Sequence, residues 1–241
     1  MTHRAAEVSP QVYARVGGWL YLLIFILAGA SMGLQSGLVV PGDAAATSNH
    51  ILASQPQWRL SVAAELAMFS IDIPLAVIFY VLLRPVSASL SLLAAFFRFA
   101  EAVMGGVFVI WHVVALVLLS GAGYLKSLEP QQLQAFVLVS LKVYDYGFGI
   151  ALMPFGLSCA LLGYLIFRST YLPKTLGVLM ALAGVCYVIN TFALILAPGL
   201  ANATFMAIIV TGFPAELGLT LWLIVFGVNV PKWNAFILSS R

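Results

Sequence analysis

The chain has 241 residues, of which 63% are hydrophobic and only 8% are charged, and its mean hydropathy is +1.07. A soluble domain carries about 25% charged residues and less than half apolar ones, so this composition excludes a soluble globular protein. Two cysteines and 20 glycines without a regular period likewise exclude a disulfide scaffold and a collagen-like repeat.

Six apolar runs are long enough to cross a membrane, because a helix needs about 20 apolar residues to span a hydrocarbon layer about 30 Å thick. The predicted spans cover residues 17–37, 60–83, 90–119, 133–167, 173–197 and 204–228. We therefore expect an all-α polytopic membrane protein, with a bundle of six transmembrane helices that forms a single domain over residues 1–241.

The longest predicted loop joins the first two spans. Pro41-Gly42-Asp43 predicts a turn followed by a helix cap, and residues 44–53 predict a short helix. We expect this interfacial helix to lie on the outer membrane surface; a lid over an outward-facing cavity is the alternative. On the first span, Gly29, Gly33 and Gly37 are spaced by four residues, which predicts close contact with another helix.

Basic residues at the span ends are divided unevenly between the two sides of the membrane. One side carries Arg4, Arg15, Arg84, Arg168, Lys174, Lys232 and Arg241, whereas the other carries Arg59 and Lys126. The positive-inside rule then places both termini in the cytoplasm and the chain in the inner (plasma) membrane of the cell. Because this topology accounts for the net charge of +3, no nucleic-acid partner is expected.

Seven charged residues lie well inside the spans, where each costs a few kcal/mol and needs a partner or water. They are Glu65, Asp72, Arg98, Glu101, Lys142, Asp145 and Glu216. Helical spacing gives the second, third, fourth and sixth spans one polar face each, and His112 belongs to the face on the third span. Four such faces predict a shared polar interior.

The depth of these residues follows from the helical rise of about 1.5 Å per residue. The midplane group is Asp72, Arg98, Glu101 and Glu216, and the group in the outer half is Glu65, His112, Lys142 and Asp145. Arg98 is expected to pair with Asp72 or Glu216, and Lys142 with Asp145. Five carboxylates against two cations cannot all stay ionised at low dielectric, so at least one midplane carboxylate is expected to be neutral at pH 7.

Catalytic and metal-binding motifs are absent from the sequence. It has no HExxH, no paired histidines, no GxSxG and no glycine-rich phosphate loop. His112 is the only histidine within a span, and it is either a hydrogen-bonded interior residue or a ligand or proton relay. We therefore expect no cofactor and no metal, and the catalytic residues, if the protein is an enzyme, are unknown.

Several motifs resemble a known family. They are the stretches 40–47 (VPGDAAAT), 82–86 (LLRPV), 146–148 (YGF), 161–169 (LLGYLIFRS) and 176–178 (LGV). Over residues 13–228 the chain resembles the bacterial family of domain of unknown function 4386, which implies a six-span membrane protein without an established activity. Members often have histidine at the positions of Tyr144 and Ser158 and aspartate at Asn190. These departures lower the expectation of an enzyme, although Asn190 can still donate and accept hydrogen bonds in the interior.

The sequence favours binding or transport of a small molecule, coupled to protons, through a carboxylate-rich interior open to the outside. The candidate residues are Glu65, Asp72, Arg98, Glu101, His112, Lys142, Asp145, Asn190 and Glu216. One alternative is an intramembrane enzyme that acts on a lipid-like substrate, with Glu65, Asp145 or His112 as acid or base. The other is a structural or regulatory membrane partner without chemistry. The expected partners are the lipid bilayer and an unknown small molecule, and a homo-oligomer is left open.

Overall fold

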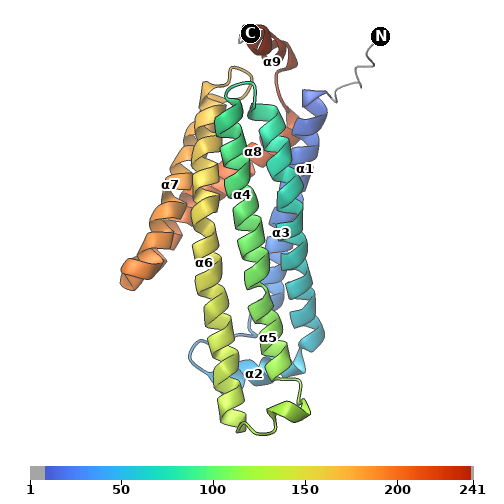
Figure 1. Ribbon diagram of the computed structural model, residues 1–241, viewed down its shortest axis with the longest axis vertical. Helices are drawn as coiled ribbons and strands as arrows, with labels where there is room; N and C mark the ends of the chain where they lie inside the picture. Colours follow the sequence, from blue (N-terminus) through green and yellow to red (C-terminus); the bar gives the residue numbers. More distant parts are fainter. Residues whose placement is uncertain (1–8, 240–241) are drawn as a thin grey trace. The chain divides into compact units, whose positions relative to one another are not determined.

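The computed structural model describes residues 9–239. Every regular element in this part of the chain is helical, so the all-α prediction is confirmed (Figure 1). The α-helices in chain order are α1 (Pro10–Gln35), α2 (Ala44–Ala53), α3 (Gln55–Leu83), α4 (Ala88–Phe108), α5 (Ile110–Leu118), α6 (Pro130–Arg168), α7 (Lys174–Leu196), α8 (Ala201–Val225) and α9 (Val230–Ser239). Short 3-10 turns cover Gly123–Leu125 and Pro198–Leu200.

Six helical stretches are long and apolar enough to cross a membrane, as predicted. They are Pro10–Gln35, Gln55–Leu83, Ala88–Leu118, Pro130–Arg168, Lys174–Leu196 and Pro198–Val225. The first helix begins at Pro10, earlier than the predicted span, because local chemistry and not hydropathy sets its start. The hydroxyl of Ser9 accepts the backbone N–H of Gln11 at 3.3 Å, and proline suits a first helical position.

Large apolar side chains are exposed along these helices. Leu196 is 77% exposed, Val210 is 67% exposed and Phe96 is 61% exposed. Contiguous apolar surface of this kind is a liability in water but is the normal surface of a helix that faces lipid. Together with the six long apolar helices, it identifies an integral membrane protein that crosses the bilayer several times.

The third span is interrupted, which the single predicted run 90–119 did not show. The break falls at Val109, between α4 and α5. Gly105 and Gly106 precede it, and glycine weakens a helix interior. The backbone N–H of His112 donates to the carbonyl of Val109, three residues back, at 3.0 Å, which tightens this turn.

The chain divides into two compact units. Unit 1 consists of Met1–Leu23, Ile71–Glu101 and Leu152–Arg241, and unit 2 consists of Ile24–Ser70 and Ala102–Ala151. A single domain over the whole chain stays a prediction. Each unit encloses its own cluster of buried polar side chains, so the units are described one at a time.

In unit 1, α7 packs against α8 and approaches α6 closely at glycines. A Cβ atom built on Gly156 would lie 2.7 Å from the carbonyl oxygen of Gly184, and one built on Gly177 would lie 2.7 Å from that of Gly163. The two glycines on each helix are seven residues apart and therefore share a face. Larger side chains at these positions would push α6 and α7 apart.

In unit 2, α2 begins as predicted, because Oδ1 of Asp43 accepts the backbone N–H three residues further on at 2.8 Å. Its location at a membrane surface stays a prediction. The close helix contact predicted at Gly29, Gly33 and Gly37 does not occur within residues 9–239, since no neighbouring atom lies within 4 Å of a Cβ built on any of the three. The tight positions in this unit are Gly105 and Gly147, against which the rings of Phe69 and Phe108 pack.

Candidate functional site

A buried ion pair joins α3 and α4 in unit 1. Arg98 is 1% exposed and Asp72 is 5% exposed. Nε and Nη2 of Arg98 both donate to Oδ1 of Asp72, at 2.8 and 2.5 Å. The predicted pairing is confirmed, but both donors share one carboxylate oxygen. Oδ2 of Asp72 and Nη1 of Arg98 are buried and have no hydrogen-bond partner among residues 9–239.

Three aromatic rings surround the guanidinium of Arg98. Its Cζ atom lies 4.9 Å from the ring centroid of Tyr21, 5.6 Å from that of Phe79 and 5.1 Å from that of Phe155. A desolvated cation gains favourable electrostatic energy from the faces of such rings. The rings and Asp72 therefore explain how an arginine is retained in the apolar interior of this unit.

Glu216 on α8 is held by two tyrosine hydroxyls. The hydroxyl of Tyr21 donates to Oε2 at 2.8 Å, and that of Tyr187 donates to Oε1 at 2.6 Å. Both carboxylate oxygens are therefore satisfied by neutral donors. Tyr21 also packs its ring against Arg98, so it links Glu216 to the ion pair.

Glu101 is the least satisfied acid of this group. It is 6% exposed, and its Oε2 atom has no hydrogen-bond partner in the described part of the chain. Its side chain interacts with the carboxyl of Asp72. Two neighbouring carboxyl groups in a low-dielectric site disfavour double ionisation and can share a proton.

We call this group the unit 1 cluster. Its members are Tyr21, Asp72, Arg98, Glu101, Tyr187 and Glu216. It contains three acids and one cation, and all three midplane carboxylates predicted from the sequence belong to it. Most of the expected excess of acid over base in the interior therefore lies in this cluster.

Unit 2 holds one further buried acid among the candidates, Glu65 on α3, which is 5% exposed. Its Oε1 atom accepts the hydroxyl of Ser31 at 2.8 Å and Nε2 of Gln35 at 2.6 Å. Its Oε2 atom lies 3.0 Å from Nδ1 of His112. Both oxygens of this carboxylate are therefore paired.

His112 is fixed by aromatic contacts as well as by Glu65. Its ring stacks on Tyr144 of α6 with centroids 3.7 Å apart, and Trp58 meets it edge-on at 5.1 Å. The indole N–H of Trp58 also donates to the backbone carbonyl of His112 at 3.1 Å. We call Ser31, Gln35, Glu65, His112 and Tyr144 the unit 2 cluster. A carboxylate on Nδ1 orients an imidazole and sets its tautomer.

Three candidate residues belong to neither cluster. Lys142 and Asp145 form the ion pair predicted within α6, at 3.1 Å, but their side chains are 70% and 59% exposed. Asn190 is buried on α7, where its Oδ1 atom accepts the hydroxyl of Thr204 at 2.8 Å. This bond joins α7 to α8 and gives Asn190 a partner outside the unit 1 cluster.

Sequence reasoning missed the neutral donors of both clusters, which are Tyr21, Tyr187, Ser31 and Gln35. One signal was available, because Ser31 and Gln35 are four residues apart and so share a helix face. Another was the two tyrosines within apolar spans, since a buried tyrosine hydroxyl usually finds an acceptor.

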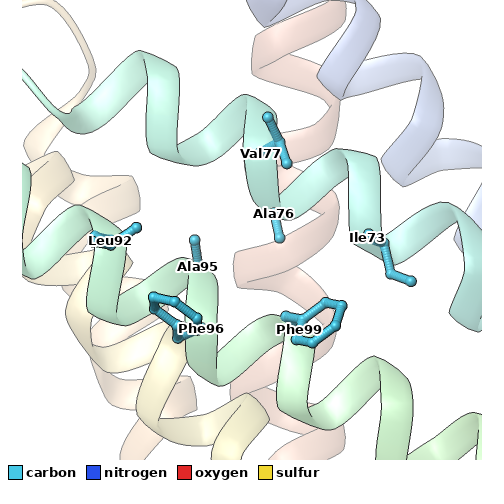
Figure 2. Close-up of a pocket in the computed structure, with 7 residues that line it drawn as sticks. All are labelled: Ile73, Ala76, Val77, Leu92, Ala95, Phe96 and Phe99. Carbon is cyan, nitrogen blue, oxygen red and sulfur yellow. The ribbon is translucent and has the colours of Figure 1, made fainter.

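Two apolar grooves lie on the surface of unit 1. One, of about 260 Å³, lies between α3 and α4, where Ala76 points toward α4 and Ala95 points toward α3 (Figure 2). The other lies between α6 and α7 and has a volume of about 360 Å³. None of the nine candidate residues lines either groove. Within residues 9–239, no group of three or more His, Cys, Asp or Glu side chains is placed to hold a metal ion.

These features define a polytopic integral membrane protein with ionisable residues buried between its helices. The chain belongs to the family described as Domain of unknown function (DUF4386), whose model matches residues 16–227, so the resemblance is confirmed. It is also 30% identical over 130 residues to an uncharacterized protein of Archaeoglobus fulgidus, a match that covers 54% of this chain and 64% of that relative. No solved structure matches the chain.

Proposed function

We propose that the protein is a proton-coupled carrier of a small molecule and that the unit 1 cluster is its proton-binding site. The observation that supports this function is the imbalance of the cluster, in which three acids accompany one arginine. Buried acids without matching cations are characteristic of proton relays in membrane transporters. Glu101 and Asp72 are the pair that exchanges the proton, because each has a buried oxygen without a hydrogen-bond partner in the described chain.

The position of the cluster along its helices supports the same function. Asp72 is 11 residues from the end of α3 at Leu83, which corresponds to about 17 Å of helix. Arg98 is ten residues from the start of α4 at Ala88, or about 15 Å. Half of a hydrocarbon layer is about 15 Å, so both residues are near the midplane, where carriers bind their coupling ions.

The orientation that completes this proposal follows from the basic residues. The ends of the spans near Arg84 and Arg168 carry most of the positive charge, which favours a cytoplasmic location for them and for both termini. The carrier would then lie in the inner (plasma) membrane. Its polar interior would open to the outside.

Proton flux into vesicles tests the proposal. Purified protein is reconstituted with trapped pyranine, and a valinomycin-dependent potassium potential drives protons inward. Wild-type vesicles are expected to acidify faster than protein-free vesicles, and Glu101→Gln to slow this entry by about tenfold or more. The matched control is Glu129→Gln, an exposed glutamate before α6, which should behave as wild type. Equal rates of acidification for wild type and Glu101→Gln, both above the rate of protein-free vesicles, would contradict the proposal.

The pair of His112 and Glu65 favours one alternative, an enzyme that acts on a lipid-like substrate. The contact of 3.0 Å between Nδ1 and Oε2 orients the imidazole as a carboxylate does in acid–base catalysis. From the spans predicted in the sequence, both residues would lie in the outer half of the membrane, closer to the lipid headgroups than to the midplane.

Lipid analysis distinguishes this alternative. Vesicles of defined phospholipids are incubated with the reconstituted protein, and new lipid products are measured by mass spectrometry. An enzyme would yield products that His112→Ala abolishes, whereas His50→Ala, which removes an exposed histidine of α2, would preserve them. If the product pattern matches that of protein-free vesicles, the enzyme alternative is rejected and the carrier proposal is unaffected.

A further inference from the structure

The groove between α6 and α7 has walls and a floor of different character. Its floor is formed by small residues, Gly163 on α6 and Gly177 and Ala181 on α7, which let the two backbones approach closely. Its walls include Phe167 and Val185, which are 44% and 51% exposed. An apolar depression on a surface that faces lipid is suited to an acyl chain.

Positive charge is located at one end of this groove. Phe167 lines the groove, Arg168 follows it directly, and Lys174 is the first residue of α7. Nζ of Lys174 lies 5.6 Å from the centroid of the Phe167 ring, which ties this cation to the groove itself. From residue 146 to residue 215 the sequence contains no acidic residue, so nothing in this stretch neutralises the two cations.

The turn that carries the two cations is firmly held. The hydroxyl of Ser169 donates to the carbonyl of Ile166 at 2.8 Å, and the hydroxyl of Tyr171 donates to the carbonyl of Leu82 at 2.8 Å. The backbone N–H of Asn229 donates to the carbonyl of Tyr171 at 3.2 Å. Burial raises the pKa of the Tyr171 hydroxyl, so it stays a donor at physiological pH. Arg168 and Lys174 therefore flank a fixed turn.

We propose that this groove binds an anionic phospholipid, with one acyl chain along α6 and α7 and the phosphate held by Arg168 and Lys174. Guanidinium and ammonium groups are the usual protein ligands of phosphate oxygens. Basic residues at the cytoplasmic ends of spans attract anionic lipid, and here an adjoining apolar groove accepts the chain of the same molecule. The site lies in unit 1 and uses no residue of the unit 1 cluster.

Charge complementarity favours a lipid over a second copy of the chain. A second copy would have to bring carboxylates to Arg168 and Lys174 at the same side of the membrane. The described loops expected on that side, residues 84–87, 169–173 and 226–229, contain no acidic residue. An anionic headgroup supplies the missing negative charge directly.

The groove between α3 and α4 provides an internal comparison (Figure 2). It is also apolar, with side chains such as Leu92 and Phe99 facing it, and none of its seven lining residues is charged. A lipid whose acyl chain enters this groove finds no charged lining residue to bind its headgroup. We therefore expect selectivity for anionic lipid at the groove between α6 and α7 and not at this one.

Native mass spectrometry from nanodiscs tests the proposal. The discs contain equal amounts of phosphatidylglycerol and phosphatidylcholine with identical acyl chains. Wild-type protein should retain phosphatidylglycerol preferentially, and Arg168→Ala with Lys174→Ala should weaken this binding by about thirtyfold. The matched control is Arg15→Ala with Lys232→Ala, which removes the same two charge types at exposed positions outside the groove and should preserve it.

A second pair of variants tests the apolar part. Ala181→Phe fills the groove, whereas Ile189→Phe enlarges an exposed side chain of α7 that does not line it. Only Ala181→Phe should reduce retained phosphatidylglycerol, while both variants keep the wild-type melting temperature. Equal retention of the two lipids by wild type, or equal loss from both double variants, would overturn the proposal. So would a dimer that Ala181→Phe dissociates without any change in bound lipid.

Discussion

The two buried polar clusters differ in how completely the carboxylate oxygens of their acids are hydrogen-bonded. In the unit 2 cluster, the Glu65 carboxylate is hydrogen-bonded to a hydroxyl, a side-chain amide and an imidazole, so each of its oxygens is paired. In the unit 1 cluster, Asp72 and Glu101 each keep a buried oxygen without a partner in the described chain. A fully satisfied network stabilises one conformation, whereas an incompletely satisfied one costs stability. Under the proposed function, the unit 2 cluster is a structural support and the unit 1 cluster is the proton-binding site.

The largest loss of stability is expected from Arg98→Ala. This change leaves Asp72 buried without a counter-ion and empties the space between three aromatic rings. Loss of one partner of a buried ion pair costs about 3–5 kcal/mol in the free energy of unfolding. Thermal unfolding in detergent measures this loss, and Arg15→Ala at an exposed position serves as control. Adding Asp72→Asn to Arg98→Ala should recover part of the loss; no recovery would mean that the aromatic contacts alone hold Arg98.

Glu65→Gln should give the second largest effect. A glutamine has one acceptor oxygen, and its NH2 group only donates. At least one of Ser31, Gln35 and His112 therefore loses its acceptor. A buried donor left without a partner costs about 1–3 kcal/mol. Chemical denaturation of the reconstituted protein measures the change. A Glu65→Gln protein as stable as wild type would remove the structural role assigned to this cluster.

A smaller effect is expected from Tyr187→Phe. It removes one of the two hydroxyls that satisfy Glu216, at a cost of about 1 kcal/mol or slightly more. Tyr164→Phe is the matched control, since Tyr164 is 49% exposed on the surface of α6. If both changes shift the melting temperature equally, the hydrogen bond to Glu216 contributes nothing specific.

The smallest effect on stability is expected from Glu101→Gln. Its carboxyl already has one buried oxygen without a partner in the described residues, and it lies beside a second carboxyl, that of Asp72. Replacing this acid by a neutral amide should leave the free energy of unfolding within about 0.5 kcal/mol of wild type or raise it. A loss as large as that of Glu65→Gln would show that the two clusters do not differ.

The spans and the ion pair of Arg98 could be predicted from the sequence because each rests on one strong energetic term. A run of about 20 apolar residues dictates a helix in lipid, and a buried cation requires a nearby carboxylate. The break at Val109 could not be predicted, because apolar residues continue on both sides of it. The start of α1 was also missed, since a hydropathy run does not record a helix cap.

The site could be predicted only in its charged members. A tyrosine in an apolar span carries a smaller energetic penalty than an ion, so the sequence indicates that Tyr21 and Tyr187 need an acceptor but does not identify which one. The position of the neighbouring backbone decides which glycines contact another helix. Gly163 and Gly177 meet such a backbone, whereas Gly29 does not. The division of the acids between two units likewise depends on tertiary contacts that a single sequence does not contain.

An infrared pH titration of the reconstituted protein tests most directly whether Glu101 and Asp72 hold an exchangeable proton. The carbonyl stretch of a protonated carboxylic acid is followed in wild type, Glu101→Gln and Glu65→Gln. The expected result is a band that disappears as the pH rises, is absent in Glu101→Gln and is retained in Glu65→Gln. A titrating band that survives in Glu101→Gln but is lost in Glu65→Gln would place the exchangeable proton in the other cluster and contradict the proposed function.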